Sequence, residues 1–165
     1  MSNRPIITGI MACDLMGAIG KNNKLPWNSE EELEHFRKTT IDNVMIMGYQ
    51  TFTSMPERAL ENRQNIVFSR TARIQIKENI VFVSSLQEFL SLINDYKDQK
   101  CFMIGGAQIV NLFLANNLIT EFILTKFKRT YGGDVFFPLH LLENWSYIII
   151  SEHTDFIIYK YLNPG

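Results

Sequence analysis

Eight short runs rich in β-branched and aromatic residues recur along the chain, separated by stretches with more polar positions. Several of these runs are apolar throughout, which is typical of strands that are buried on both faces of a sheet. We expect strands at residues 6–12, 44–47, 65–69, 80–83, 101–104, 121–127, 146–152 and 156–161.

Most of the intervening stretches have a helical pattern, and this alternation is typical of crossover connections between parallel strands. It predicts an α/β fold with a largely parallel sheet. The last two runs are separated only by Thr154-Asp155, which is too short for a crossover, so they should form an antiparallel hairpin at one edge. No repeat or linker divides the chain, and we expect a single domain over residues 1–165. Helices are expected at residues 29–40, 51–55, 86–96 and 107–117.

Composition and charge argue against nucleic acids and membranes as binding partners. The 16 basic and 17 acidic residues nearly balance, so we expect no broad attraction to nucleic acid or anionic lipid. No apolar stretch approaches the ~20 residues that span a bilayer, which argues against a membrane partner. Residues 6–12 could be mistaken for the apolar part of a secretory signal, but Asp14 interrupts the run and no convincing cleavage site follows.

The cysteines and histidines show neither a disulfide nor a metal pattern. Cys13 and Cys101 stand far apart and belong to no C-x-x-C pair, so reduced thiols and a cytoplasmic location are the simpler interpretation. His35, His140 and His153 lack the spacing of metal ligands, and we assign no metal.

Candidate chemistry begins on the first predicted helix. At about 100° per residue, Glu32, Leu33, Phe36 and Thr40 fall within one sector, so the carboxylate leans towards the apolar side. A buried carboxylate is costly unless a ligand or a proton satisfies it, which indicates a functional site. However, Ser29-x-x-Glu32 is also a capping box, in which the glutamate reaches back to the helix N-terminus. The spacing alone leaves both interpretations open.

The segment before this helix favours a site. Gly20 and the polar residues 21–24 form a predicted mobile loop, closed by the stiff corner Leu25-Pro26-Trp27. A loop beside a carboxylate is typical of a lid over a reaction. The full pattern is Ala-Ile-Gly at 18–20, four residues, Leu-Pro-Trp, four residues, Glu32, three residues, Phe36, three residues and Thr40.

This pattern resembles the signature of the dihydrofolate reductases, and the match runs through the whole signature without an insertion or deletion. The resemblance continues in order through Ile-Met-Gly at 46–48, Asn-Ile-Val-Phe-Ser at 65–69, Met-Ile-Gly-Gly-Ala at 103–107, Leu-Thr at 124–125 and Gly-Asp at 133–134 before Phe137-Pro138. It implies a three-layer α/β/α fold with about eight strands. It also implies an enzyme that passes hydride from NADPH to C6 of 7,8-dihydrofolate while N5 gains a proton, yielding tetrahydrofolate for one-carbon and thymidylate metabolism. The implied partners are dihydrofolate and antifolate-type molecules, and the implied state is a monomer.

The resemblance also assigns the substrate site. Glu32 would accept paired hydrogen bonds from the pterin edge and promote N5 protonation through water. Thr125 would support it, although a strand threonine is ordinarily explained by β-propensity. Arg63 would hold the α-carboxylate of the glutamyl tail, although a lone loop arginine is usually solvated surface. The implied catalytic residues are Glu32, Trp27, Leu25 and Thr125, and the implied substrate contacts are Ile10, Ala12, Leu25, Glu32, Phe36, Arg37, Met55, Arg63 and Thr125, with Arg58 a weaker candidate for the tail.

For the cofactor, Gly105-Gly106 is not the dinucleotide fingerprint, and alone it would read as a tight turn. In the family this link is typically a cis peptide beside the nicotinamide, and the following helix directs its N-terminus at the pyrophosphate. Arg70 would contact the 2′-phosphate and favour NADPH over NADH, and Asp134 would anchor the lid. The implied cofactor contacts are Ala12, Ile19, Gly20, Gly48, Tyr49, Gln50, Thr51, Ser69, Arg70, Gly105, Gly106, Ala107, Gln108 and Ile109.

Three features depart from the bacterial pattern. Tyr49 occupies a position that is often basic, and Val110 occupies one that is often tyrosine. The hairpin at Thr154-Asp155 is shorter than usual, so it should lack a contact that holds the lid.

Two other functions remain as alternatives. One is another pyridine-nucleotide reductase on the same architecture, acting on pterin or riboflavin precursors. The other is a nucleotide-binding module in which Glu32 only caps its helix.

Overall fold

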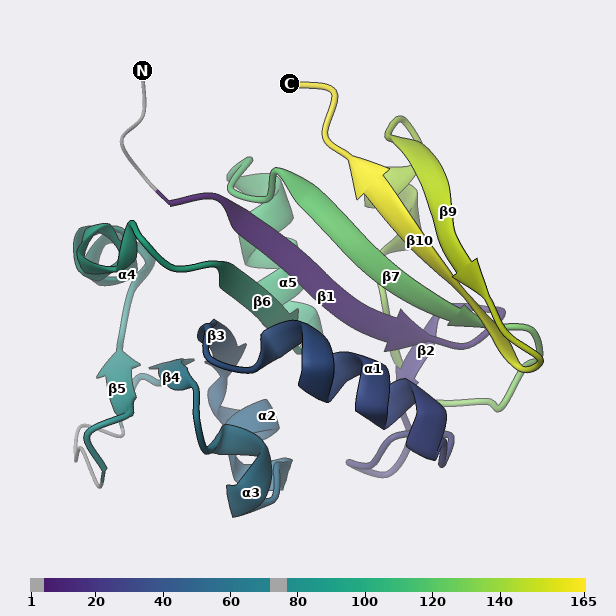
Figure 1. Ribbon diagram of the computed structural model, residues 1–165, viewed down its shortest axis with the longest axis horizontal. Coiled ribbons are helices and arrows are strands. Elements are labelled where there is room, and N and C mark those ends of the chain that lie inside the picture. Colours follow the sequence, from purple (N-terminus) through teal and green to yellow (C-terminus); the bar gives the residue numbers. More distant parts are fainter. Residues whose placement is uncertain (1–4, 72–76) are drawn as a thin grey trace.

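The computed structural model describes residues 5–71 and 77–165. Its centre is an eight-stranded sheet in the order β5-β4-β3-β6-β1-β7-β10-β9 (Figure 1). No helix in these two ranges is long and apolar enough to cross a membrane. The strands of this sheet are β1 (Ile7–Cys13), β3 (Val44–Gly48), β4 (Gln64–Phe68), β5 (Ile80–Val83), β6 (Cys101–Gly105), β7 (Glu121–Phe127), β9 (Ser146–Glu152) and β10 (Phe156–Leu162).

Strand direction follows the connection lengths. Every pair from β5 to β7 is parallel, whereas β10 pairs antiparallel with both β7 and β9. The eight predicted strands and the C-terminal hairpin are therefore confirmed. The fold is the expected mixed, mostly parallel α/β sheet.

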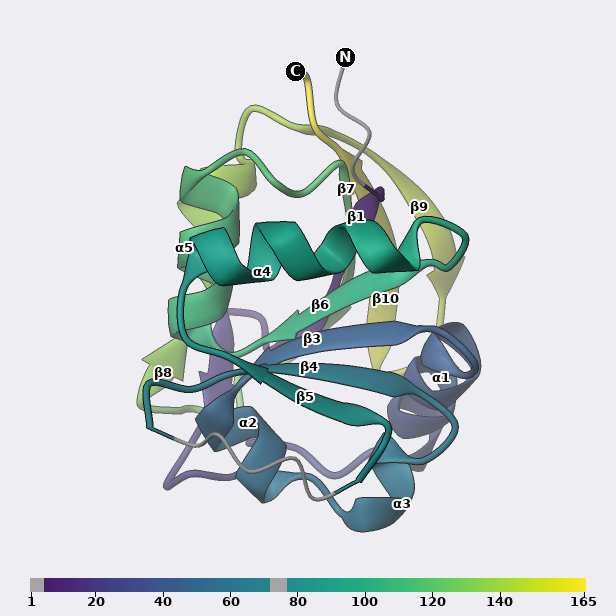
Figure 2. The same ribbon diagram turned by 90° about the vertical axis from the view of Figure 1, so that its left-hand side faces the viewer.

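Helices cover both faces of the sheet, and α1 and α5 lie on opposite sides (Figures 1 and 2). The alternation of side chains along β3 explains this. Ile46 packs into the core under α4 and α5, whereas Met45 and Met47 pack into a second core with Phe36 of α1 and Leu60 of α3. The helices are α1 (Glu30–Thr40), α2 (Tyr49–Ser54), α3 (Glu57–Leu60), α4 (Leu86–Ile93) and α5 (Ala107–Ala115), with 3-10 turns η1 (Asn94–Tyr96) and η2 (Leu139–Leu142).

Two features were absent from the prediction. The four-residue helix α3 is too short to show a periodicity. A separate two-stranded sheet pairs β2 (Ala18–Gly20) with β8 (Val135–Phe136), and strands of three and two residues carry no readable alternation either. Helix α2 also begins two residues before the predicted residue 51.

Close packing at the centre of the sheet provides a test of the fold. A Cβ at Gly9 in β1 would lie 2.4 Å from two ring atoms of Phe122 in β7. We expect Gly9→Ala to lower the free energy of unfolding by about 2 kcal/mol, because an added methyl forces the ring or the strands apart. Urea unfolding measures this, and Gly9→Ala/Phe122→Leu should recover part of the loss. Equal losses in the single and double variants would contradict the contact.

Candidate active site

Helix α1 presents Glu32 to the sheet rather than to solvent. Ser29 caps the helix through its own hydroxyl, which accepts a hydrogen bond from the Glu32 backbone N–H at 3.2 Å. In the described part of the chain, the Glu32 carboxylate accepts no hydrogen bond back from Ser29. Ser29 therefore caps the helix without the Glu32 side chain, whose carboxylate stays available, and the capping-box interpretation of Glu32 is not borne out.

The environment of Glu32 changes its acidity. The residue is only 7% exposed. Burial raises the pKa of Glu32 to about 7. The Trp27 indole N–H is also buried and has no hydrogen-bond partner among the described residues. Glu32 can therefore hold or release a proton near neutral pH.

Trp27 belongs to a group of packed rings that we call the aromatic wall, made of Trp27, Phe127 and Tyr131. The Trp27 ring lies 4.7 Å from the Phe127 ring and 6.2 Å from the Tyr131 ring, measured between centroids. Phe156 and Ile158 of β10 complete this apolar cluster. The wall holds the Pro-Trp corner against the end of β7.

The residues expected to line the pterin slot come from both cores. Phe36 and Met55 are half-buried against the core that contains Met45 and Met47, while Ala12 packs beside the aromatic wall. Leu25 is 56% exposed, which leaves its apolar side chain available to a ligand. The buried residues expected at this site are Ile10 at 3% and Thr125 at 1% exposure.

Thr125 stands opposite Ala12 in the register of β7 and β1. Within residues 5–71 and 77–165, no hydrogen bond joins its hydroxyl to Glu32. The supporting role of Thr125 stays a prediction.

The predicted loop at residues 21–24 is a tight turn. Asn22 and Asn23 have φ of 53° and 65°, and the backbones of Lys21 and Lys24 exchange hydrogen bonds of 2.8 and 3.0 Å. Two consecutive left-handed residues favour asparagine and match the twist of paired strands. We call residues 20–27 the lid.

Asp134 holds the lid at its turn, as the resemblance implied. The Asn22 N–H donates to the Asp134 carboxylate at 3.2 Å, and the Asp134 N–H donates to the Gly20 carbonyl at 2.9 Å. These contacts extend the β2–β8 pairing. The lid therefore docks on the segment that follows β7.

Arg63 is not the solvated surface residue that a lone loop arginine suggests. It is 7% exposed, and burial lowers the pKa of its guanidinium. Its Nε donates to the Thr40 hydroxyl at 3.0 Å, and its Nη2 donates to the Arg37 carbonyl at 3.0 Å. A third donor, Nη1, bonds the Glu61 carbonyl at 2.8 Å. Since a guanidinium has five N–H donors, two remain for a ligand.

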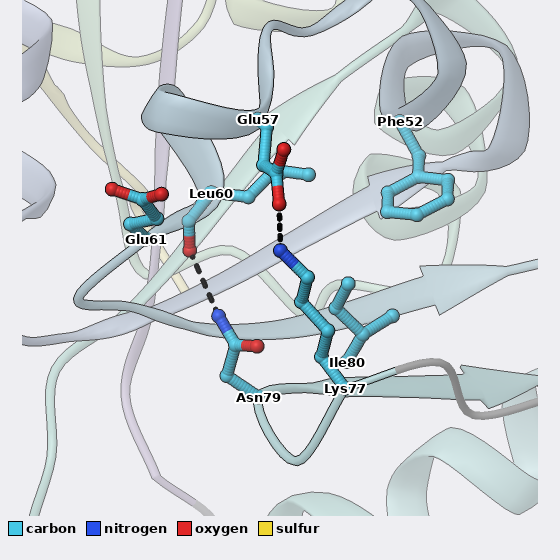
Figure 3. Close-up of a pocket in the computed structure, with 7 residues that line it drawn as sticks. All are labelled: Phe52, Glu57, Leu60, Glu61, Lys77, Asn79 and Ile80. Carbon is cyan, nitrogen blue, oxygen red and sulfur yellow. Dashed lines mark hydrogen bonds and ion pairs between the residues drawn. The ribbon is translucent and has the colours of Figure 1, made fainter.

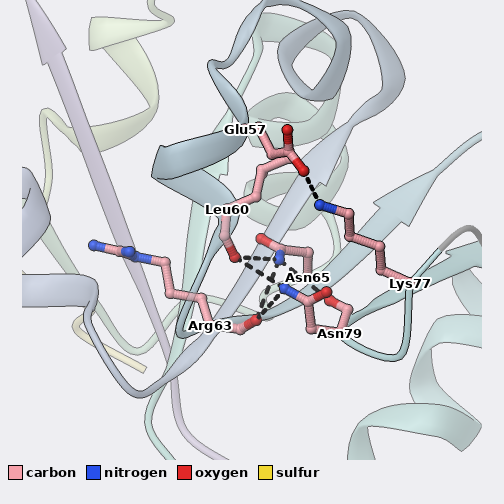
Figure 4. A network of polar contacts seen from close by, with 6 residues as sticks. All are labelled: Glu57, Leu60, Arg63, Asn65, Lys77 and Asn79. Atoms are coloured by element: carbon pink, nitrogen blue, oxygen red, sulfur yellow. Dashed lines mark hydrogen bonds and ion pairs between the residues drawn. The ribbon is translucent and has the colours of Figure 1, made fainter.

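Two asparagines fix the backbone that carries Arg63 (Figure 4). The Asn65 amide donates to the carbonyls of Leu60 and Arg63 at 2.9 and 3.2 Å, and the Asn79 amide donates to the same carbonyls at 3.1 and 3.2 Å. Figure 4 shows the Arg63 side chain leaving this network in the opposite direction. Neighbouring Arg37 is instead half-buried and pairs with Glu34 at 3.8 Å.

A separate pocket of about 220 Å³ lies on the outer side of α3 (Figure 3). Its apolar floor comes from Phe52, Leu60 and Ile80, and an ion pair between Glu57 and Lys77 crosses its rim. Glu61 and Asn79 complete the lining. None of the residues expected to contact substrate or cofactor lines this pocket.

Two groups of expected cofactor residues, 48–51 and 105–109, lie at the carboxyl ends of β3 and β6, which are neighbours in the sheet. The Gly105-Gly106 peptide bond is cis, as the resemblance implied. Gly105 has φ of +105°, a region that disfavours side chains. Helix α5 begins directly afterwards, and no side chain caps its first turn. Its N–H groups can therefore bind an anion.

The glycines here form a tight cradle. A Cβ at Gly48 would lie 3.0 Å from Ile109 of α5, and one at Gly105 would lie 2.8 Å from Met11. A Cβ at Gly106 would meet only the Thr51 hydroxyl, at 3.5 Å. The backbone is thus open to a flat or phosphorylated ligand. Ala107 is half-buried and Gln108 exposed at the start of α5, while Ile19 and Gly20 of β2 are half-buried.

The residues expected at the adenosine end differ in exposure. Ser69 is buried and its hydroxyl accepts from the Thr71 N–H at 3.3 Å, whereas Arg70 is exposed. Tyr49 and Gln50 are exposed at the start of α2, and the Tyr49 ring lies 6.2 Å from Phe52. Because Tyr49 stands where the family often has a basic residue, Arg70 is the charged side chain among the expected contacts at this end. Val110 is fully buried in α5.

The short hairpin contacts α1. His153, between β9 and β10, forms an ion pair with Glu31 and bonds the Ser151 hydroxyl at 2.9 Å. Its ring stacks on Phe156 at 4.5 Å. Burial, followed by the nearby His153, lowers the pKa of His35. The hairpin thus holds the N-terminal turn of the Glu32 helix.

Two residues of this region escaped prediction. Asp14 is fully buried and Tyr131 is part of the aromatic wall. The only signal for Asp14 was its interruption of an apolar run, and Tyr131 had none beyond its place before Gly132-Gly133. No group of three metal-ligating side chains occurs in the part of the chain that the structure describes.

Comparisons with known proteins agree with this geometry. A family model described as dihydrofolate reductase matches residues 6–157. The Dihydrofolate reductase of Ureaplasma parvum is 36% identical over 149 residues, covering 90% of this chain and 92% of that protein. The Dihydrofolate reductase of Bacillus subtilis is 33% identical over 171 residues, covering 97% of each. Segregation and condensation protein A of Mycoplasmoides gallisepticum is 32% identical over 146 residues, which are 88% of this chain but 24% of that longer protein.

Proposed function

Because the chain belongs to the dihydrofolate reductase family, whose members reduce dihydrofolate to tetrahydrofolate with a nicotinamide cofactor, we propose that its hydride donor is NADPH and that Glu32 binds the pterin. The observation that carries this proposal is the buried carboxylate of Glu32, capped independently by Ser29 and placed beside the lid. A carboxylate that only capped its helix would not need this burial.

Glu32 does two things in the proposed reaction. Its two oxygens accept hydrogen bonds from the 2-amino group and the neighbouring ring nitrogen of the pterin, which fixes the ring plane. Burial raises the pKa of Glu32 to about 7, so a proton is available near neutral pH. The proton reaches N5 through water, because the carboxylate grips the opposite side of the pyrimidine ring. Thr125 supports the carboxylate, and Trp27 and Leu25 close the slot.

The rest of the substrate lies along α1. Phe36 and Met55 contact the apolar rings, and the backbone of Ile10 and Ala12 in β1 adds further contacts. Arg63 meets the α-carboxylate of the tail with its two remaining N–H donors, because its other three are already bonded within the protein. Arg37 lies nearby as a second cation.

The residues present fit a nicotinamide dinucleotide. When bound, NADPH supplies the hydride. The cradle at Gly48, Gly105 and Gly106 admits the flat ring, since side chains there would meet Met11 or Ile109. The uncapped start of α5 offers N–H groups to the pyrophosphate. Residues of the lid then exclude water from the slot.

Arg70 should decide the choice between the two nicotinamide cofactors. We expect Arg70→Gln to raise the KM for NADPH by about tenfold or more and to leave that for NADH unchanged, because a charged hydrogen bond to the 2′-phosphate is lost. Steady-state kinetics with both cofactors measure this. Lys97→Gln removes an exposed charge after η1 and serves as the control. Equal use of both cofactors by the unchanged protein would contradict the proposal.

We further propose that the protein acts as a monomer in the cytoplasm, on dihydrofolate and on antifolate-type inhibitors. The direct test mixes purified protein with NADPH and dihydrofolate and follows the loss of nicotinamide absorbance. Turnover that requires both compounds is expected. Absence of turnover with folded protein would reject the proposed reaction, and reduction of another pterin or of a riboflavin precursor instead would favour the related reductases.

A further inference from the structure

The Asp14 carboxylate is a fully buried charge that the proposed reaction does not use. Its Oδ1 accepts hydrogen bonds from the N–H groups of Met16 and Ala18, each at 2.9 Å. Its Oδ2 accepts from the N–H groups of Tyr131 and Gly132 at 2.8 and 3.1 Å. One oxygen therefore holds the segment before the lid, and the other holds the segment after β7.

Further contacts lock the same two segments together. The Leu15 N–H donates to the Arg129 carbonyl at 3.0 Å, and the Phe137 N–H donates to the Gly17 carbonyl at 2.7 Å. The two segments then continue into β2 and β8, which pair with each other. The Asp14 side chain accepts hydrogen bonds from both segments.

The approach of the two segments leaves almost no room. A Cβ at Gly133 would lie 2.4 Å from the Gly20 carbonyl oxygen and 3.0 Å from the Ala18 side chain. The obstacle is backbone on one side, so a small separation of the segments would displace the start of the lid. The spacing thus depends on Asp14 and on a missing side chain at Gly133.

Asp14 also reaches the catalytic region through Tyr131. The Tyr131 backbone is bonded by Asp14, while its ring packs against Trp27 and lies under the Arg129 guanidinium at 4.5 Å. A set of contacts therefore runs from Asp14 through Tyr131 to the Trp27 ring of the aromatic wall.

We propose that Asp14 is a positioning residue, which sets the base of the lid and the aromatic wall so that both meet the substrate in the correct geometry. This inference rests on the proposed reductase function. Asp14 does not touch the substrate or the cofactor. Its effect should appear in the rate of the reaction and in the surroundings of Trp27.

The test compares Asp14→Asn with Ile93→Ala. Ile93 is fully buried in α4, outside the expected contacts, so its variant matches the loss of stability without touching either segment. We expect Asp14→Asn to lower kcat by about tenfold to a hundredfold, as small misplacements near a site do. Ile93→Ala should keep kcat at a temperature where both variants are folded.

Fluorescence gives a second readout that needs no substrate. The chain has two tryptophans, so Trp145→Phe leaves Trp27 as the reporter of the aromatic wall. In that background, Asp14→Asn should shift the Trp27 emission to the red and Ile93→Ala should not. An unchanged emission, or an unchanged kcat in the folded variant, would overturn the proposal.

If Asp14→Asn does not fold, Gly133→Ala decides the matter, because it separates the same two segments while Asp14 stays in place. A fall in kcat together with a red shift of the Trp27 emission supports the proposal, and unaltered kcat rejects it. Lack of turnover by the unchanged protein would reject the reductase function instead, while the Trp27 emission would still report whether Asp14 positions the wall.

Discussion

Glu32→Gln is expected to lower kcat for dihydrofolate reduction by about 10²- to 10⁴-fold, which is the usual contribution of a positioned acid–base group. The amide keeps the size of the side chain but cannot hold a transferable proton, and it places a donor where the pterin edge also donates. Steady-state turnover at slightly acidic pH measures the loss. Glu30→Gln makes the same change on the exposed face of the first turn of α1 and should keep full activity. Equal activities of the two variants would contradict the role of Glu32.

Stability provides an independent check on the same variant. The pKa of Glu32 is raised from 4.5 to about 7, so the folded protein retains a proton that the unfolded chain releases. The free energy of unfolding therefore falls as pH rises from about 4.5 to about 7, by about 3 kcal/mol at most. Glu32→Gln lacks this ionisation and should be the more stable protein at pH 8. Urea unfolding of both proteins at the pH of the assay shows whether the variant is folded there, so that lost activity can be separated from unfolding.

The second large effect is expected at Asp14. An asparagine there keeps one acceptor oxygen and turns an N–H₂ group towards backbone donors, so two of the four N–H groups lose their partner. We expect Asp14→Asn to lower the free energy of unfolding by about 3 kcal/mol at pH 7. Urea unfolding, compared with that of Ile93→Ala, gives the value.

Asp14 and Glu32 should change the free energy of unfolding with pH in opposite directions. Burial alone would raise the pKa of Asp14, but the four backbone N–H donors outweigh it and lower the pKa below 3.8. The contribution of Asp14 is therefore complete above about pH 4 and is lost as pH falls through the lower folded value. The difference between the unchanged protein and Asp14→Asn should shrink in acid. A difference that is small at pH 7, or constant down to pH 2, would contradict the network.

The strands and most helices could be predicted because their patterns are long. Seven-residue strands such as β7 and β10 and the eleven-residue helix α1 carry enough positions for a period to appear. The same periodicity placed Glu32 on the buried side of α1. In contrast, β2 and β8 pair across more than a hundred residues of sequence, and their three and two residues show no period.

The residues of the candidate site also fall into those that the sequence could predict and those that it could not. Ser29, Glu32 and the Leu-Pro-Trp corner are close in sequence, so their relation can be read from spacing. Arg63 looked like surface because its partner Thr40 is distant in the chain. Asp14 looked like a simple interruption because its four donors are backbone groups, which have no signature in the sequence. Such long-range backbone contacts become visible only in the folded chain.

The pH dependence of the hydride-transfer rate tests the central claim most directly. Single-turnover measurements of the unchanged protein with NADPH and dihydrofolate should show a rate that falls as pH rises through about 7, the value to which burial raises the pKa of Glu32. Glu32→Gln should give a low rate without this titration. A rate in the unchanged protein that does not titrate near 7, or a Glu32→Gln profile that retains the same midpoint and height, would contradict the account.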